Sequence, residues 1–454
     1  MKKFFTCLVV IFLISGISIF GISCKKNGDS ASSSISEISK ESSSSEISND
    51  GKTEESKTST EPVTLNILLM SQSGYSEEDS RKISEEFTSK NPNIKINPTF
   101  IAYESLHDKI ITSFAGGGDA YDVVLVDCVW TAELVSAGYL MDISGKITDE
   151  MKEDIWPELF KAGLYNDKYF AMPWLNDIPY FYYNEKILKD AGFSAPPKTW
   201  TELIEQAKAI KQKGLVEYPY IDAWPQTEEL VVQYTLYNSA LGGNYFDKDM
   251  NVILNKPEGK GVDSLNFMLN GLKEKVINPS SMEMHYDDVR KVLSQGNAAF
   301  ALGWTYMWGM LNDPNESKVV GDMKIALIPG QETTSVTVNG GMALGISSKT
   351  KYPDEAFKYI EYMSSKDVQR RFSQNSLPIW ISLYDDPEVK ETQPDLVNIS
   401  KEQYKYIVNR PIVPWYAEFS RSIQLEIQNA LVGSKTAEQA VNDISQKANE
   451  LKSK

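Results

Sequence analysis

The chain has 454 residues, more than a single hydrophobic core usually organises, so we expect at least two domains. Its formal net charge is −16 at pH 7, with 62 acidic against 46 basic residues and no basic patch, which argues against nucleic acid or an anionic membrane surface as a partner. Only two histidines are present, and HExxH, CxxC and GxSxG motifs are absent. We therefore expect no metal, no cofactor and no triad chemistry.

The first 23 residues have the pattern of a secretory signal: Lys2 and Lys3 precede an uncharged, mainly apolar stretch at residues 4–23. The stretch ends in Gly21-Ile22-Ser23-Cys24 and resembles a bacterial lipoprotein signal, in which the cysteine, here Cys24, becomes the lipidated first residue. The position three places before the cysteine is usually Leu and is Gly21 here. An uncleaved membrane anchor is the alternative, because about 20 apolar residues can also span a bilayer. Both readings predict a body tethered outside the cytoplasm.

Residues 24–61 are expected to form a disordered linker. Between Gly28 and Glu61 there are 13 serines in 34 residues and no aromatic residue, so this segment cannot bury enough surface to offset the entropy of ordering. Cys128 is the single cysteine beyond the linker, and no intramolecular disulfide is therefore expected. We expect Cys128 to be a small buried side chain rather than a nucleophile.

The pattern after residue 62 is typical of alternating strands and helices. Apolar stretches at residues 63–70, 93–100 and 121–126 predict strands, and a capping box that begins at Ser76 predicts the first helix. The third stretch, YDVVLV, is apolar throughout, as in a parallel strand buried on both faces. This order predicts an α/β lobe.

Asp127 directly follows that third strand. Ligands of open α/β sheets bind outside the carboxyl ends of the strands, so this place makes Asp127 a candidate for ligand binding. The alternative is that Asp127 caps a helix running through Leu134 and Leu140.

Residues 171–184, AMPWLNDIPYFYYN, predict a crossing between two lobes. Pro173 and Pro179 cannot donate to a sheet ladder and favour extended backbone before them, so the segment should be extended with interrupted pairing. The functional part is expected at residues 173–177, and Tyr182 to Asn184 are assigned to the sheet of the second lobe.

Beyond the crossing, a helix is predicted from Thr199 to Gly214, with Trp200 as a packing residue. Further helices are predicted at residues 230–241 and 261–272, as one continuous helix at 353–372, and in two C-terminal segments that follow one another around Gly433. Strands are predicted at residues 297–303, 324–328 and 342–346.

Aromatic residues, acids and amides recur near the predicted strand ends, a composition that suits a sugar. A pyranose presents an apolar face that Trp can cover and a rim of hydroxyls that carboxylates accept from and Arg donates to. A packing role is the alternative for each Trp. The residues concerned are Asp127, Trp130, Trp174, Asn176, Asp177, Trp304, Tyr306, Trp380, Trp415 and Tyr416.

From about residue 62 onward, the chain resembles an extracellular solute-binding protein of the bacterial carbohydrate-uptake ABC transporters, in the trehalose- and maltose-type branch. The matching segments occur in the order of the family: YDVVLVDCVWTAELVSAGYLMDIS, MPWLNDIPYFYYNEKIL, PPKTWTEL, NAAFALGW, NGGMALGISSKTKYPDEAFKYIEYMSS, LPIWISLYDDPEV and RPIVPWYAEFS followed by ALVGSKTAEQAV. The resemblance implies a two-lobed α/β fold with three crossing segments and a ligand in the cleft between the lobes.

The resemblance also implies roles for single residues. Asp127 and Asp177 correspond to cleft carboxylates, Trp304 to a stacking Trp and Arg410 to an Arg that donates to hydroxyls. Glu228 lies in Gln226 to Leu230, a block like the QYEGL of the family, and Gly340 and Gly341 match a glycine pair at which the backbone approaches the ligand. The family often has Trp after that pair, where this chain has Met342, which puts trehalose or maltose themselves in doubt; Trp380 is a candidate to compensate. The full set of expected ligand-binding residues is Asp127, Trp130, Asp177, Glu228, Trp304, Gly340, Gly341, Arg410 and Tyr416.

We therefore expect a signal at residues 1–23, a linker at 24–61, an N-terminal lobe from 62–173 and 329–376, and a C-terminal lobe from 174–328 and 377–454. The expected function is that of a monomeric, lipid-anchored binding protein that captures a mono- or oligosaccharide by hinge closure and delivers it to a membrane permease. Two alternatives stay open: a receptor of the same fold for a non-sugar solute, and a surface glycoside hydrolase, since two suitably spaced carboxylates among the 62 acids would suffice.

Overall fold

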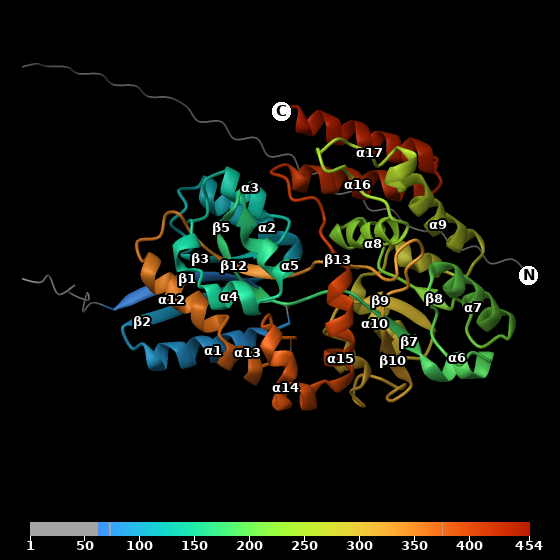
Figure 1. Cartoon of the computed structure of the whole chain (residues 1–454), viewed down its shortest axis with the longest axis horizontal. Coiled ribbons are helices and arrows are strands. Elements are labelled where there is room, and N and C mark those ends of the chain that lie inside the picture. Colours follow the sequence, from blue (N-terminus) through green and yellow to red (C-terminus); the bar gives the residue numbers. More distant parts are fainter. Residues whose placement is uncertain (1–61, 72–73, 375) are drawn as a thin grey trace, which may run out of the picture. The chain divides into compact units, whose positions relative to one another are not determined.

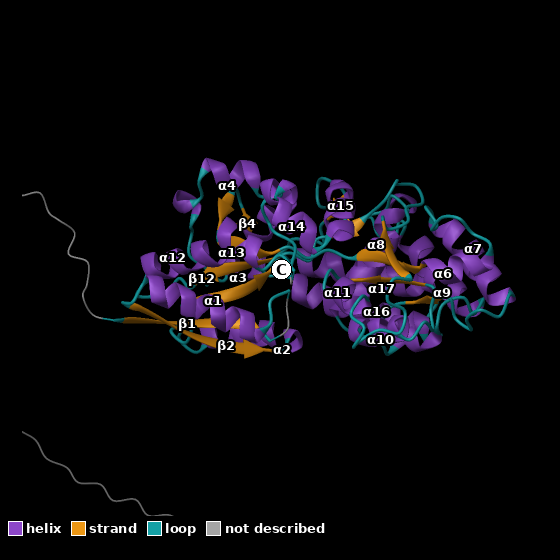
Figure 2. Ribbon diagram, turned by 90° about the horizontal axis from the view of Figure 1, so that it is seen from below, coloured by secondary structure: helices purple, strands orange, loops and turns teal. Residues whose placement is uncertain are grey.

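The computed structural model describes residues 62–71, 74–374 and 376–454 (Figure 1). The expected signal, Cys24 and the linker at 24–61 lie outside the described residues. Within the described residues, two mixed sheets with their own helices form two lobes (Figure 2).

The first sheet has the strand order β2-β1-β3-β12-β6. β1 is parallel to β2 and β3, whereas β12 is antiparallel to β3 and β6. Each residue of β3 is buried, so the prediction of a parallel strand covered on both faces is confirmed. The bounds of the strands are β1 Val63–Met70, β2 Ile94–Ile101, β3 Val123–Asp127, β6 Ala171–Leu175 and β12 Met342–Ile346.

Helices cover this sheet (Figure 1), and a hairpin of two short strands, β4 and β5, lies between α5 and β6 in the chain. The predicted capping box at Ser76 is present, and Ile83 and Phe87 on the same helix are buried, because four-residue spacing places both on the face toward the sheet. The bounds are α1 Glu77–Lys90, α2 Tyr103–Ala115, α3 Thr131–Ser136, α4 Asp149–Asp154, α5 Pro157–Phe160, α12 Pro353–Met363, α13 Lys366–Arg371, β4 Leu164–Tyr165 and β5 Lys168–Tyr169.

Two helix predictions are wrong in extent. The helix expected through Leu140 ends at Ser136, because Gly138 adopts a left-handed backbone with φ 73° and closes the last turn. The single helix expected at residues 353–372 is two helices, α12 and α13. Ser365 caps the second by accepting from the backbone N–H of Val368, and a serine hydroxyl that binds nearby backbone in this way competes with helix continuation.

The second sheet has the order β10-β7-β9-β8. β7 pairs antiparallel with β10 and β9, and β8 pairs parallel with β9. The bounds are β7 Tyr180–Asn184, β8 Tyr220–Ile221, β9 Phe300–Gly303, β10 Met323–Ala326, α6 Glu185–Ala191, α7 Trp200–Gln212, α8 Glu228–Ala240, α9 Gly261–Lys273, α10 Tyr286–Ser294, α11 Met307–Leu311, α14 Pro387–Thr392, α15 Pro394–Gln403, α16 Tyr416–Leu431 and α17 Ala437–Lys452. Single 3-10 turns lie at Ser144–Lys146, Lys161–Gly163, Pro257–Gly259, Pro279–Met282, Ile381–Asp385 and Tyr404–Tyr406.

Residues 171–184 do cross between the two sheets. β6 belongs to the first sheet and β7 to the second, and residues 176–179 between them are unpaired apart from one bridge, from Asn176 to Leu377. The proline-based prediction of an extended, interrupted segment is thus confirmed, and so is the assignment of Tyr182 to Asn184 to the second sheet.

Two further passages between the lobes pair with each other. β11 (Thr337–Val338) lies between β10 and β12, and β13 (Ile407–Val408) lies between α13 and α16; the two strands form a short parallel sheet. The hydroxyl of Thr337 also donates to the carbonyl of Pro179, at 2.8 Å, which ties the first crossing to the second. The described part of the chain therefore has three passages between its lobes, and they are bonded to one another.

Packing accounts for several tryptophans. Trp200 is 4% exposed and Trp174 only 1%, with Trp174 stacked on Tyr75 at 5.2 Å, so these two side chains belong to the cores. No helix among the described residues is long and apolar enough to cross a membrane.

Candidate functional site

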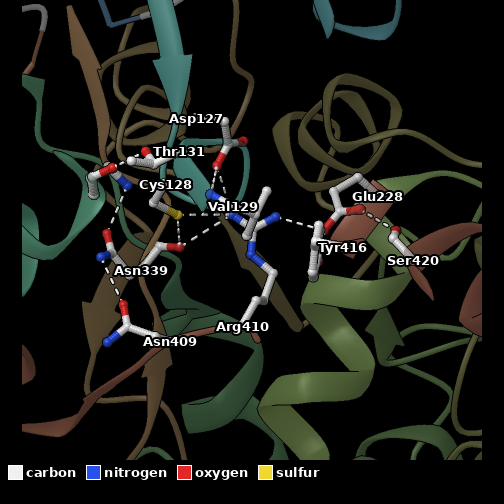
Figure 3. Close-up of polar contacts among 12 residues, drawn as sticks. Asp127, Cys128, Val129, Thr131, Glu228, Asn339, Asn409, Arg410, Tyr416 and Ser420 are labelled. Atoms are coloured by element: carbon white, nitrogen blue, oxygen red, sulfur yellow. Dashed lines mark hydrogen bonds and ion pairs between the residues drawn. The ribbon is translucent and has the colours of Figure 1, made fainter. Parts of the chain in front are cut away.

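Arg410 connects the two carboxylates expected from opposite lobes. Its Nη2 lies 3.3 Å from Asp127 Oδ1 and its Nη1 lies 2.6 Å from Glu228 Oε1 (Figure 3). The side chains of Arg410 and Asp127 are 2% and 3% exposed, and that of Glu228 is 16% exposed. Two carboxylates and one guanidinium thus form a buried ionic group that joins Asp127, at the end of β3, to Glu228, at the start of α8.

Asp127 is fixed by its place at the end of β3. Its carboxylate accepts from the Tyr103 hydroxyl at 2.8 Å and from the backbone N–H of Val129 at 3.2 Å. Trp130, not Asp127, stands before the first residue of α3 and makes no side-chain cap there. The N-cap alternative for Asp127 is therefore wrong, and its carboxylate points toward Arg410.

Glu228 is the first residue of α8, where the positive end of the helix dipole favours a carboxylate. It accepts hydrogen bonds from the hydroxyls of Tyr416 and Ser420, which lie one turn apart on α16 (Figure 3). Burial and then the charge of Glu228 raise the pKa of Tyr416 well above its ordinary value, so Tyr416 remains a neutral donor.

The guanidinium of Arg410 has further partners on the first lobe. Its Nη2 donates to the backbone carbonyl of Asn339 at 3.3 Å and contacts Cys128 Sγ at 3.4 Å, while its Nε has no partner among the described residues. Burial opposes the charge of Arg410, but Asp127, Cys128, Tyr416 and Glu228 together outweigh burial and raise the pKa of Arg410. Burial also raises the pKa of Cys128, which agrees with a packed thiol rather than a nucleophile.

A second group of expected residues forms around Asp177. The Asp177 carboxylate accepts from the backbone N–H of Thr305 at 3.2 Å, and its backbone carbonyl accepts from Gly340 N–H at 3.0 Å. Asp177 is partly exposed, and burial raises its pKa to about 7.

Trp304 lies beside Asp177 and against the glycine pair. A Cβ on Gly340 would come within 2.3 Å of Cζ3 of the Trp304 ring, and a Cβ on Gly341 within 2.7 Å of Leu159 Cδ2. The ring of Trp304 also meets Tyr286 edge-on at 5.6 Å and remains partly exposed. Glycine is required at both positions because side chains of the protein itself approach the backbone there.

Trp130 lies among other aromatic rings. It is 6% exposed, stacked on Tyr103 at 5.5 Å and tilted against His107 at 5.3 Å. Trp380 is 5% exposed and donates through Nε1 to the carbonyl of Ser364, at 2.7 Å, so its indole N–H already has a partner within the protein. The structure thus brings Asp127, Glu228, Arg410 and Tyr416 into direct contact, and Asp177, Trp304 and Gly340 into a neighbouring group.

Comparison with known proteins assigns the chain to a family. The family of bacterial extracellular solute-binding proteins has a model that matches residues 74–370. The chain belongs to this family. The expected family resemblance is confirmed, and this solute-binding protein shares family and fold with binding proteins rather than with enzymes. Membership also implies a location outside the cytoplasm.

Two curated relatives and one solved structure illustrate the match. A probable ABC transporter-binding protein of Deinococcus radiodurans is 28% identical over 281 residues, which cover 60% of this chain and 66% of that protein. A probable amino-acid ABC transporter periplasmic-binding protein of Sinorhizobium fredii is 23% identical over 388 residues, covering 83% of this chain and 87% of that protein. The maltose-bound structure of MalE3 from T. maritima has a TM-score of 0.78 and 27% identity, and the match covers 86% of this chain and all of that one. The two-lobed α/β fold is confirmed by this likeness.

The sequence reasoning missed three residues of the site in this solute-binding protein: Tyr103, Asn339 and Ser420. Asn339 carried a signal, because it directly precedes the glycine pair; its side chain accepts from Gly341 N–H at 2.9 Å. Ser420 carried one too, four residues after Tyr416 on the same helix face. Tyr103 follows β2 at the same sheet edge as Asp127, which the rule on strand ends could have found.

The described residues contain no group of side chains suited to a metal ion. Nowhere in residues 62–71, 74–374 and 376–454 do three or more His, Cys, Asp or Glu side chains gather so that they could hold a metal ion. The polar groups that the solute-binding protein does gather are carboxylates, hydroxyls, one guanidinium and backbone amides, which are suited to hydrogen-bonding a polar organic solute.

Proposed function

We propose that the chain is the substrate-binding lipoprotein of an ABC sugar importer. It captures a mono- or oligosaccharide between its lobes, closes, and delivers the sugar to the membrane permease without covalent chemistry. The observation that carries this proposal is the likeness to maltose-bound MalE3, at 27% identity and a TM-score of 0.78 over all of that chain.

The chemistry of the two neighbouring groups supports a sugar. Carboxylates accept from hydroxyls, guanidinium and phenol donate to them, and the partly exposed ring of Trp304 offers an apolar surface for a pyranose face. The contacts proposed for the ligand are those of Asp127, Trp130, Asp177, Glu228, Trp304, Gly340, Gly341, Arg410 and Tyr416. A sugar hydroxyl that reaches Asp127 or Glu228 would share each carboxylate with Arg410.

Closure of the cleft provides the coupling to transport. A ligand that contacts residues of both lobes binds the closed arrangement better than the open one and shifts the population toward it. The permease would then recognise the closed form. The proposed lobes are residues 62–173 with 329–376 and residues 174–328 with 377–454, and the proposed working unit is a monomer.

We also propose that Cys24 anchors the body to the membrane through lipid. Support comes from the apolar run before it and from the extracellular character of the family. Radiolabelled palmitate should be incorporated by the wild-type chain expressed in a bacterium with lipoprotein processing, and not by Cys24→Ser. Label that persists in Cys24→Ser would reject lipidation at this residue.

A non-sugar solute is the second candidate, favoured by the name of the Sinorhizobium fredii relative, an amino-acid transporter component. A thermal-shift screen over sugars, amino acids and polyamines separates the candidates, because any ligand that binds only the folded state raises the melting temperature. Shifts by sugars support the proposal. Shifts confined to amino acids or polyamines would reject it.

A glycoside hydrolase remains the candidate from a different class. Incubation with the sugars that cause thermal shifts, followed by chromatography of the products, distinguishes it. Intact sugar recovered after long incubation supports a binding protein, whereas shorter sugars released in proportion to protein concentration would support hydrolysis.

A further inference from the structure

Asp177 differs from the other two carboxylates of the site because it has no cation. Asp127 and Glu228 share the guanidinium of Arg410. Among the described residues, by contrast, no lysine, arginine or histidine forms an ion pair with Asp177, and its carboxylate accepts from Thr305 N–H at 3.2 Å. The site therefore contains three carboxylates and one compensating positive charge.

The surroundings of Asp177 are aromatic. The titratable groups that face it are the phenols of Tyr180, Tyr182 and Tyr306, and burial together with the charge of Asp177 raises the pKa of each. These neutral groups cannot balance a carboxylate. Trp304 lies on the same side, since its ring touches Gly340, whose N–H binds the carbonyl of Asp177.

Two of these aromatic side chains are open to a ligand. Trp304 and Tyr306 are each partly exposed, as is Asp177 itself, whereas Tyr180 and Tyr182 are buried. The hydroxyl of Thr305 beside them is buried. A carboxylate next to partly exposed aromatic side chains can hold an organic cation, through an ion pair and cation–π attraction.

Ligand binding makes the missing charge more costly. Closing the lobes over a solute would remove water from Asp177, and a carboxylate deprived of water must be paired or take up a proton. A neutral solute offers only hydroxyls. A solute with a positively charged nitrogen pairs with Asp177 directly and keeps it ionised.

We propose that the solute carries a protonated amine, as in an amino sugar, and that Asp177 binds this ammonium group beside the rings of Trp304 and Tyr306. The inference rests on the proposed function for the sugar part of the ligand. Asp177 would then set the substrate class, while Asp127, Glu228 and Arg410 bind hydroxyls.

Three disaccharides of the same skeleton test the inference, because they differ only at the second carbon of each ring: fully deacetylated chitobiose, with ammonium, N,N′-diacetylchitobiose, with neutral amide, and cellobiose, with hydroxyl. Titration calorimetry at neutral pH should show that the dissociation constant of the deacetylated sugar is about tenfold or more below those of the other two, because the deacetylated sugar alone can form an ion pair with Asp177. Asp177→Asn should reduce that ratio to about one. Asp263→Asn is the control, since Asp263 is an acid of the same lobe that pairs with Lys260, and it should leave the ratio unchanged.

The other outcomes are also decisive. A preference for cellobiose or the diacetylated sugar, or a preference for the amine that survives Asp177→Asn, would overturn the inference. Binding of maltose but of none of the three would likewise overturn it and leave the sugar-importer proposal standing. If no sugar binds and spermidine does, with loss in Asp177→Asn, the ammonium site is supported and the sugar-importer proposal is rejected.

Discussion

Removing the guanidinium of Arg410 should be among the most destabilising single changes in this protein. Arg410→Met keeps much of the volume of the side chain but leaves Asp127 and Glu228 buried without a cation. Their side chains are 3% and 16% exposed, so water cannot replace the lost partner. Breaking a buried ion pair in this way costs about 3–5 kcal/mol.

Arg290 offers a matched control for this experiment. Its side chain is also buried, at 6% exposure, and also pairs with two acids, but Asp287 and Glu316 are 47% and 45% exposed. Water can solvate both acids once the arginine is gone, so Arg290→Met should cost about 1 kcal/mol from the ion pairs, with the packing loss common to both variants.

Urea denaturation followed by tryptophan fluorescence, together with the melting temperature, measures the difference between the variants. The Arg410→Met midpoint should fall well below that of Arg290→Met at neutral pH. Adding Asp127→Asn and Glu228→Gln to Arg410→Met should recover most of the loss. Equal midpoints for Arg410→Met and Arg290→Met at neutral pH would refute the view that Arg410 compensates two buried carboxylates.

The remaining predictions concern the Asp177 and Trp304 group. The pKa of Asp177 is raised to about 7 in the folded protein, against about 4 in the unfolded chain, so folding takes up a proton between these values and the free energy of unfolding falls as the pH rises through this range. Asp177→Asn should remove this fall, and urea denaturation at pH 8 should show a gain in the free energy of unfolding of at most about 4 kcal/mol. Absence of a pH-dependent gain would contradict the raised pKa. Trp304→Ala should abolish sugar binding in calorimetry. It should lower the melting temperature less than Trp174→Ala, a substitution in the core that should cost about 3–5 kcal/mol. A larger loss of melting temperature for Trp304→Ala would show that Trp304 is a core residue. Gly340→Ala should weaken binding by displacing the Trp304 ring, which a new Cβ would approach to 2.3 Å, and should destabilise the fold by about 1–3 kcal/mol. In a Trp304→Ala background that cost should fall, because the carbonyl of Asp177, at 3.0 Å, is then the closest remaining contact, and an undiminished cost would show that the ring is not what the methyl group meets.

Local patterns predicted the parts of the fold that depend on neighbours in sequence. The apolar residues of β3 can be buried on both faces only in a sheet that is covered on both sides. Pro173 and Pro179 prevent continuous pairing in the crossing. Both features could therefore be predicted from the sequence. The break between α12 and α13 could not, because the apolar spacing continues through it. Ser365, which caps α13, interrupts the helix locally, and the Ser364 hydroxyl beside it donates to the carbonyl of Pro173, 191 residues away, a contact that the sequence does not reveal.

The candidate site shows the same division. The position of Asp127 at a strand end followed from the sequence, but its pairing did not: Asp127 and Arg410 are 283 residues apart, and Arg410 and Glu228 are 182 apart. No local spacing encodes such contacts, and only the resemblance to a family placed Arg410 and Glu228 near the cleft at all.

Aromatic residues were the least predictable part. Composition alone treats Trp130, Trp174, Trp304 and Trp380 alike, yet three of them are at most 6% exposed and only Trp304 keeps a partly open ring. The difference arises from the partners that tertiary packing supplies, such as Tyr103 and His107 around Trp130. A tryptophan beside a strand end therefore indicates a ligand surface only when the neighbouring elements leave one face uncovered.

The bonds among the three passages between the lobes have a mechanical consequence. The pairing of β11 with β13 and the hydrogen bonds from Thr337 to Pro179 and from Gly340 to Asp177 would have to break or shift if one passage bent while the other two stayed still. Three separate tethers would let the lobes twist and slide in several directions, whereas we expect passages that are bonded to one another to bend together. The protein without ligand would then move along the same path between open and closed arrangements as the protein that binds a ligand. A permease surface that recognises the closed arrangement would need to distinguish it only from the open one.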